Sequence, residues 1–172
     1  MRLLGLDPGL RKTGWGVIEA ESGRLRHVAN GTLSTDLALD TPARLAQLYE
    51  GVAAVIERYA PQEAAVEESF VNKNASSTLK LGLARGVVLL APARAGLKVT
   101  EYPTNLVKKT VVGAGHAEKA QIQAMVRHLL PLAEIEGADA ADALAVAICH
   151  AHHGATLSRW RAYERAADLG RP

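Results

Sequence analysis

Cysteine, aromatic residues and long apolar runs are all scarce in this chain. Cys149 is the only cysteine among 172 residues, so no disulfide can form within the chain, and we expect a reducing, cytoplasmic location. No apolar run approaches the length of a membrane-spanning helix, and the start MRLLGLDPG meets Asp, Pro and Gly before the apolar core of a signal peptide could form. With one Phe, two Trp and four Tyr, aliphatic side chains must build the core of one domain.

The chain also has no strong excess of either charge, because it contains 20 Lys and Arg residues and 18 Asp and Glu residues. The charges are unevenly distributed, however. Residues 72–119 contain eight basic and two acidic residues, whereas residues 131–153 contain four acids and neither Lys nor Arg. A basic surface beside an acidic cluster suits an enzyme that binds a polyanion and holds a metal, although two ordinary solvated faces would give the same pattern.

Hydrophobic periodicity predicts alternating strands and helices. The predicted strands are residues 2–7, 13–20, 24–33, 63–69 and 97–102, and the first three are expected to form an antiparallel meander. The predicted helices are residues 40–61, 76–96, 103–111, 117–130 and 137–153. This order indicates an α/β fold with a five-stranded mixed sheet flanked by helices. Residues 154–172 have a weak pattern and are interpreted as a C-terminal tail that need not be ordered.

Three local features of the helices carry further expectations. Thr41 is expected to cap the helix that starts with Pro42. Pro92 should kink or end the helix over 76–96. Gly82 and Gly86, four residues apart in that helix, would allow another element to approach closely.

Two carboxylates interrupt the aliphatic stretch DAADALAVAIC, at Asp139 and Asp142. Three residues apart on a helix, they share one face, and burying either one is costly unless it is compensated. A basic partner, an open solvent face or a divalent cation would each remove the difficulty. Asp139 lies near the helix start and could also serve only as a cap.

Two other strands end in acids. Asp7 follows the apolar run RLLGL, and Glu67 and Glu68 follow the run AAV. Asp7 could be a turn former, and alternation allows only one of the two glutamates to point inward with it. Four inward carboxylates would carry about four negative charges, which two Mg²⁺ ions would neutralise, with Mn²⁺ as a substitute, because hard oxygen ligands select such cations.

Four motifs, in order, resemble those of the RuvC-type Holliday junction resolvases: GLDPGLRKTGWGVIE, VEESFVNKNASSTLKLGLARGVV, NLVKKTVVGAGHAEKAQIQAMV and GADAADALAVAICH. The resemblance covers residues 1–153, which we therefore interpret as a ribonuclease-H-like nuclease domain. It implies a homodimer that cuts four-way junction DNA by magnesium-dependent nicking of two like strands, in company with a branch-migration complex of the RuvA and RuvB type. It assigns the catalytic, metal-binding acids to Asp7, Glu67, Asp139 and Asp142, and selects Glu67 over Glu68 because Glu67 stands three residues before Phe70.

The same resemblance assigns roles to several other residues. Lys108 and Lys119 flank the site, and Phe70 is a wedge that stacks on an unpaired base, although a core aromatic is the alternative. Lys73, Lys80 and Lys109 are expected to follow the DNA backbone or simply to face solvent. Lys119 also stands out without the resemblance, because a cation in the first turn of a helix opposes the helix dipole unless an anion lies nearby. Its alternative is an exposed lysine balanced by Glu118.

Histidines suggest weaker hypotheses. His116, beside the glycine-rich loop, could assist proton transfer, and the spacing of His150, His152 and His153 does not match a zinc site.

Three other functions remain open at this stage. One is an ATP-dependent sugar-kinase or actin-like domain, which also opens with D-x-G but normally needs two such domains. The others are a ribonuclease-H-like nuclease acting on RNA, and a DNA-binding module without catalysis.

Overall fold

The computed structural model describes residues 1–68 and 74–169, with side chains as far as Gly154. One sheet has the strand order β3-β2-β1-β4-β5. The strands are β1 (Arg2–Asp7), β2 (Lys12–Glu21), β3 (Arg24–Ser34), β4 (Glu63–Glu68) and β5 (Lys98–Pro103). β1, β2 and β3 pair antiparallel, while β4 pairs parallel with both β1 and β5. The predicted five-stranded mixed sheet and its initial meander are confirmed.

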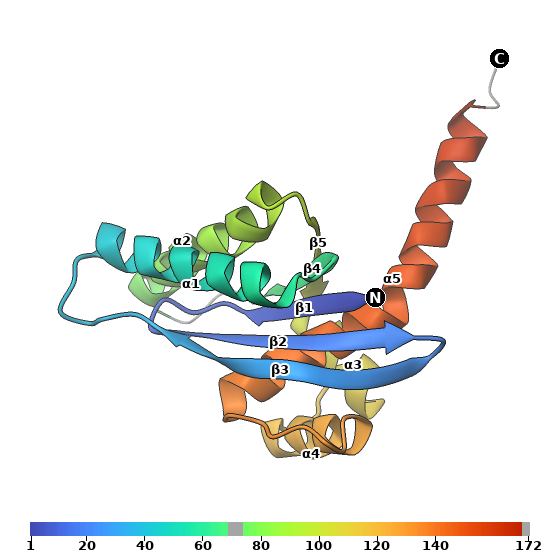
Figure 1. The fold of residues 1–172 in the computed structure, drawn as a ribbon, viewed down its shortest axis with the longest axis horizontal. Coiled ribbons are helices and arrows are strands. Elements are labelled where there is room, and N and C mark those ends of the chain that lie inside the picture. Colours follow the sequence, from blue (N-terminus) through green and yellow to red (C-terminus); the bar gives the residue numbers. More distant parts are fainter. Residues whose placement is uncertain (69–73, 170–172) are drawn as a thin grey trace.

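Helices cover both faces of this sheet (Figure 1). α1 (Thr41–Tyr59) and α2 (Ala75–Arg94) lie on one face, and α3 (Thr104–Val112), α4 (Lys119–Leu129) and α5 (Ala138–Leu169) lie on the other. Within the described residues, no helix combines the length and the apolar character needed to cross a membrane.

Strand alternation divides the core into two layers. Leu4 and Leu6 of β1 pack with α1 and α2, whereas Leu3 of β1 and Ala65 of β4 pack with α5. Because side chains alternate along a strand, Asp7 points to the same face as Leu3. Glu67 follows Ala65 to that face in the same way, and Glu68 points to the opposite face.

Glycine lets α5 lie against the backbone of the sheet. A Cβ atom added at Gly5 would lie 2.1 Å from the carbonyl oxygen of Ala143, and one at Gly14 would lie 2.0 Å from that of Asp139. Any larger residue at these positions would push the helix away. The acidic first turns of α5 are therefore held next to the end of β1, where Asp7 pairs with Gly14.

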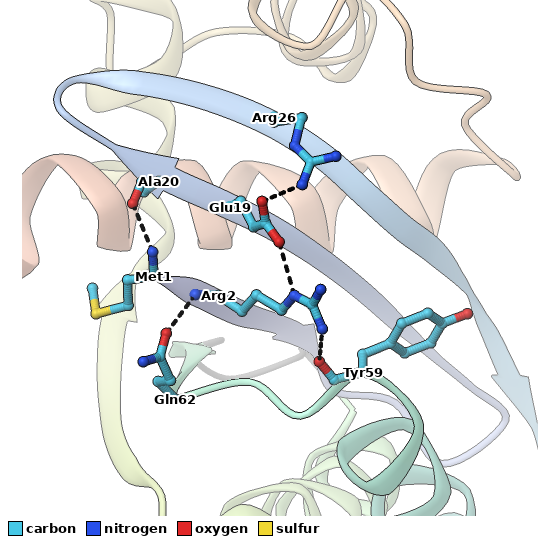
Figure 2. Close-up of polar contacts among 7 residues, drawn as sticks. All are labelled: Met1, Arg2, Glu19, Ala20, Arg26, Tyr59 and Gln62. Carbon is cyan, nitrogen blue, oxygen red and sulfur yellow. Dashed lines mark hydrogen bonds and ion pairs between the residues drawn. The ribbon is translucent and has the colours of Figure 1, made fainter.

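A polar cluster fixes the opposite end of β1 (Figure 2). Arg2 donates from Nε to Glu19 of β2 at 2.9 Å and from Nη1 to the carbonyl oxygen of Tyr59 at 3.0 Å, and its backbone N–H donates to Gln62 at 2.8 Å. Arg26 of β3 also pairs with Glu19. These contacts join β1 to β2 and to the connection between α1 and β4.

One local prediction in the helices is corrected. Asp40 rather than Thr41 caps α1, because its Oδ1 accepts from the backbone N–H of Ala43 at 3.0 Å and Thr41 is already helical. No other element of the described residues uses the close approach that Gly82 and Gly86 allow, since a Cβ added at either position would meet open space. Pro92 lies near the end of α2, which stops at Arg94.

α5 continues well past the predicted helix. Its backbone is helical to Leu169, so residues 154–169 do not leave the helix as a separate irregular tail. Ala, Leu, Arg and Glu are good helix formers, and they are common in the stretch RAYERAADL. The last turns of α5 extend beyond the sheet (Figure 1). The boundary of the nuclease domain at residue 153 stays a prediction.

Candidate active site

Acids from three elements meet in one cavity of about 290 Å³. Asp7 comes from the end of β1, Glu67 from β4 and Asp142 from α5. The cavity is also lined by Thr104, Val107, Lys108, Lys119, Ile122 and Ala145. The sequence-predicted acids Asp7, Glu67 and Asp142 and both predicted lysines therefore come together in one cavity.

Asp139 occupies a different position from the other three acids. It lies one turn before Asp142, is half-buried, and is not part of the cavity wall. Its charge still reaches the cavity, since it contributes to raising the pKa of Asp7 and of Asp142.

Asp7 is the most strongly perturbed carboxyl group of the site. Burial, followed by the charge of Glu67 and a hydrogen bond with it, raises the pKa of Asp7 from 3.8 to about 8. Asp142 and Asp139 act in the same direction. At neutral pH the cavity therefore favours a proton on Asp7, which is the state expected of clustered acids without a compensating cation.

Lys119 compensates one of these acids directly. Its Nζ lies 3.2 Å from Oδ2 of Asp142, and the two form an ion pair. Burial nevertheless raises the pKa of Asp142, with Lys119 opposing this shift, and the charge of Asp142 raises the pKa of Lys119. Glu118, the partner suggested by the sequence, is replaced in this role by Asp142. The Lys119 side chain is 72% exposed, so it can also reach a ligand in the cavity.

The donors suit a hard divalent cation, because every acid of the site presents carboxylate oxygens. Across the described ranges, no three His, Cys, Asp or Glu side chains already converge in a metal-binding arrangement. The site thus offers a loose group of acids, in which the pKa of Asp7 is raised and Asp142 is paired with Lys119, rather than a closed cage. Metal binding here would displace the proton of Asp7 and compete with Lys119 for Asp142.

Comparison with known proteins identifies the family. Residues 3–150 match the sequence profile described as "Crossover junction endodeoxyribonuclease RuvC". The chain belongs to the RuvC family of crossover junction endodeoxyribonucleases. Proteins with the same name from Rhizobium meliloti and Rhodospirillum rubrum are similar to it. The first is 60% identical over 153 residues, covering 89% of this chain and 90% of the relative, and the second is 63% identical over 155 residues, covering 90% and 92%.

Solved structures agree with the RuvC family and with the ribonuclease-H-like fold. The structure described as "T. thermophilus RuvC in complex with Holliday junction substrate" is 33% identical with a TM-score of 0.82, covering 90% of this chain and 94% of that one. The yeast mitochondrial Holliday junction resolvase Ydc2 has a TM-score of 0.65 at 12% identity, covering 94% and 83%, and so shows the fold alone.

The remaining residues that the RuvC resemblance singled out fall in three places. Lys108 is half-buried in the cavity wall, whereas Lys80 and Lys109 are exposed outside it. Phe70 and Lys73 lie outside the described residues.

Among the histidines, His116 is exposed and is not part of the cavity wall. His150 is 1% exposed, with Nδ1 2.8 Å from the Tyr102 hydroxyl and Nε2 2.8 Å from Glu63, and burial lowers its pKa. His153 lies 2.8 Å from the Thr110 hydroxyl. His150 and His153 therefore take part in contacts between α5 and its neighbouring elements.

Sequence reasoning missed Asn30 of β3, which binds the segment that precedes α5. Its amide nitrogen donates to the carbonyl oxygen of Glu134 at 2.8 Å and lies 2.7 Å from Nε2 of His27, and its Oδ1 accepts from the N–H of Glu136 at 2.9 Å. Asn30 is 7% exposed. It thus fixes the segment just before α5, and with it the turn that carries Asp139. Glu134 and Glu136 lie more than 100 residues away from Asn30 in sequence, so no local signal could reveal these two contacts.

Proposed function

We propose that this chain resolves four-way Holliday junctions by hydrolysing one phosphodiester in each of two like strands, with two Mg²⁺ ions held by Asp7, Glu67, Asp139 and Asp142. Mn²⁺ would substitute. The observation that carries the proposal is the cavity that joins Asp7, Glu67 and Asp142 with two lysines in a protein of the RuvC family.

The acids fit the proposed cations by charge and by chemistry. When bound, the divalent ions would lower the pKa of the attacking water and shield the charge on phosphorus and on the leaving oxygen. The chain supplies hard oxygen donors for them, and Asp7 gains most, because burial beside Glu67 makes its lone charge unfavourable. Asp139, outside the cavity wall, would bind from the rim of the site.

The two lysines bind and orient the strand to be cut. Lys108 is half-buried in the cavity wall, while Lys119 reaches in from the start of α4. A DNA phosphate entering the cavity gives Lys119 a second anion besides Asp142, and it offsets the unfavourable position of a cation at a helix start. Lys80, Lys109 and, outside the described residues, Lys73 would follow the backbone farther from the cut. Phe70 would stack on a base near the crossover.

Two like nicks call for two copies of the cavity, and α2 offers a surface for a homodimer. Leu79, Leu83 and Leu90 are 67%, 41% and 51% exposed, and Gly82 and Gly86 leave space open between them. Their spacing places them along one side of the helix. Such an exposed apolar face is typical of a protein interface. The branch-migration complex of the RuvA and RuvB type and the cytoplasmic location stay predictions.

The test is cleavage of a synthetic four-way DNA junction with and without Mg²⁺, using wild type and Asp7→Asn. Wild type should cut two like strands only with Mg²⁺, and the variant should bind the junction yet cut at least a thousandfold more slowly. Equal cutting by both proteins would remove Asp7 from the mechanism, and equal cutting without Mg²⁺ would remove the cation.

Parallel substrates separate the other functions considered from the sequence. Faster cutting of an RNA–DNA hybrid than of the junction would favour the RNA nuclease. A large increase in melting temperature with ATP, and none with the junction, would favour the kinase-like domain. Tight junction binding with no cutting in any metal would favour the non-catalytic module.

A further inference from the structure

Thr104, the first residue of α3, lines the cavity with a side chain that carries a hydroxyl group, and the sequence reasoning did not consider it. It lies in the cavity wall together with Glu67 and Lys108. The strand register explains this placement, because Glu67 pairs with Tyr102 and the chain turns from β5 into α3 immediately after Pro103. A side chain at the start of α3 must therefore lie near the end of β4.

This hydroxyl has no hydrogen-bond partner among the described residues, although acceptor carboxylates share its cavity. The other threonine of α3 behaves differently. The Thr110 hydroxyl donates to the carbonyl oxygen of Leu106 at 2.7 Å and lies 2.8 Å from Nε2 of His153. Thr110 is thus engaged within the protein, whereas the Thr104 hydroxyl is left for whatever enters the cavity.

The charge around Thr104 favours an anion as that ligand. α3 has no acid in its first turn, and Pro103 supplies no side-chain cap. The first backbone N–H groups of a helix lack partners within the helix and carry partial positive charge. Lys108, one turn further along α3, adds a full positive charge to the same wall. Together these groups bring positive charge into a cavity that also holds the acids.

We infer that the Thr104 hydroxyl donates a hydrogen bond to a non-bridging oxygen of the phosphate that is cut, and so positions that phosphate against the acids. The inference rests on the proposed hydrolysis in this cavity. The hydroxyl acts as a donor because the phosphate oxygens only accept, and its contact strengthens as charge builds up on them during the reaction.

The first test is single-turnover cutting of a four-way junction by Thr104→Val, which keeps the shape of the side chain but removes the hydroxyl. We expect the cutting rate to fall roughly tenfold or more, because losing a hydrogen bond to a charged group commonly costs that much. Junction affinity should stay within about threefold of wild type. Thr104→Ser should restore most of the rate. In the matched control, Thr110→Val should lower the melting temperature while leaving the rate within about threefold.

Sulfur substitution at the cut phosphate separates a direct contact from a structural role. If Thr104 donates to one non-bridging oxygen, replacing that oxygen with sulfur should slow wild type more than it slows Thr104→Val, for one phosphorothioate isomer only. Equal slowing of both proteins by both isomers, or an unchanged rate in Thr104→Val, would overturn the inference. Asp7→Asn is measured alongside. If it cuts at the wild-type rate, the proposed acid site is wrong. If Asp7→Asn is inactive while Thr104→Val is fully active, only the proposed role of Thr104 is wrong.

Discussion

Replacing Asp7 with Asn should make the metal-free protein more stable at neutral pH. The folded state holds the Asp7 proton more tightly than the unfolded chain does, because burial and Glu67 raise its pKa from 3.8 to about 8. Ionising this group therefore favours unfolding. The free energy of unfolding of wild type should fall as pH rises from about 4 to about 8, and this part of the fall should be missing in Asp7→Asn.

The size of the effect follows from the pKa difference. Each pKa unit corresponds to about 1.36 kcal/mol, and at pH 7 Asp7 is ionised in the unfolded chain but protonated in the folded state, so its titration would lower the free energy of unfolding by roughly 4 kcal/mol relative to pH 4. Part of that gain is offset, because an amide does not fully reproduce the hydrogen bond between Asp7 and Glu67. We therefore expect Asp7→Asn to gain roughly 2–3 kcal/mol at pH 7, or roughly 5–10 °C in melting temperature for a domain of this size.

The assay is thermal and urea unfolding of both proteins at pH 5, 6, 7 and 8 with a chelator present. Asp36→Asn is the matched control, because Asp36 is exposed and an amide oxygen can still accept from the N–H of Ala38. Its stability should follow wild type at every pH. If Asp7→Asn is less stable than wild type at pH 7 and its pH dependence runs parallel to that of wild type, the raised pKa of Asp7 is refuted.

Three further predictions test other parts of the account. Glu67→Gln should slow junction cutting at least a hundredfold, while Glu68→Gln, its neighbour on the opposite face of β4, should stay within about threefold; similar losses would contradict the division of the two faces. Asn30→Ala should lower the free energy of unfolding, measured in urea, by roughly 2–4 kcal/mol, because it leaves buried backbone groups unpaired. A loss below about 0.5 kcal/mol would show that Asn30 does not hold the segment before α5. Leu83→Glu should convert a dimer to a monomer in light scattering, with exposed Leu132→Glu as the control, and an unchanged mass would remove α2 from the interface.

Local patterns predicted most of the elements, and the RuvC resemblance selected the acids of the site among the candidates that these patterns left open. Alternation over RLLGLD and AAVEE placed Asp7 and one glutamate on a shared face, and the packing of Leu3 and Ala65 identifies that face as the one covered by α5. The three-residue spacing of Asp139 and Asp142 put both on one side of a helix. Spacing could not show that only Asp142 reaches the cavity wall, since that depends on how α5 crosses the sheet.

Features that depend on distant parts of the chain escaped prediction. Thr104 enters the cavity only because β5 lies next to β4, and Asn30 acts on a segment that follows four later helices. The cap of α1 was misplaced by one residue because Asp40 and Thr41 are both good caps, and only the backbone conformation distinguishes them. No other element of the described residues packs against Gly82 or Gly86. Two glycines four residues apart therefore do not by themselves predict a helix contact within the fold.

The central claim is that divalent cations take the place of a proton among these acids. Calorimetric titration of Mg²⁺ or Mn²⁺ at pH 7, in buffers of different ionisation enthalpy, measures the protons released on binding. With the pKa of Asp7 near 8, wild type should release close to one proton per chain, and Asp7→Asn should bind more weakly and release clearly fewer protons. Equal metal affinity in both proteins, with no proton released by either, would contradict the account.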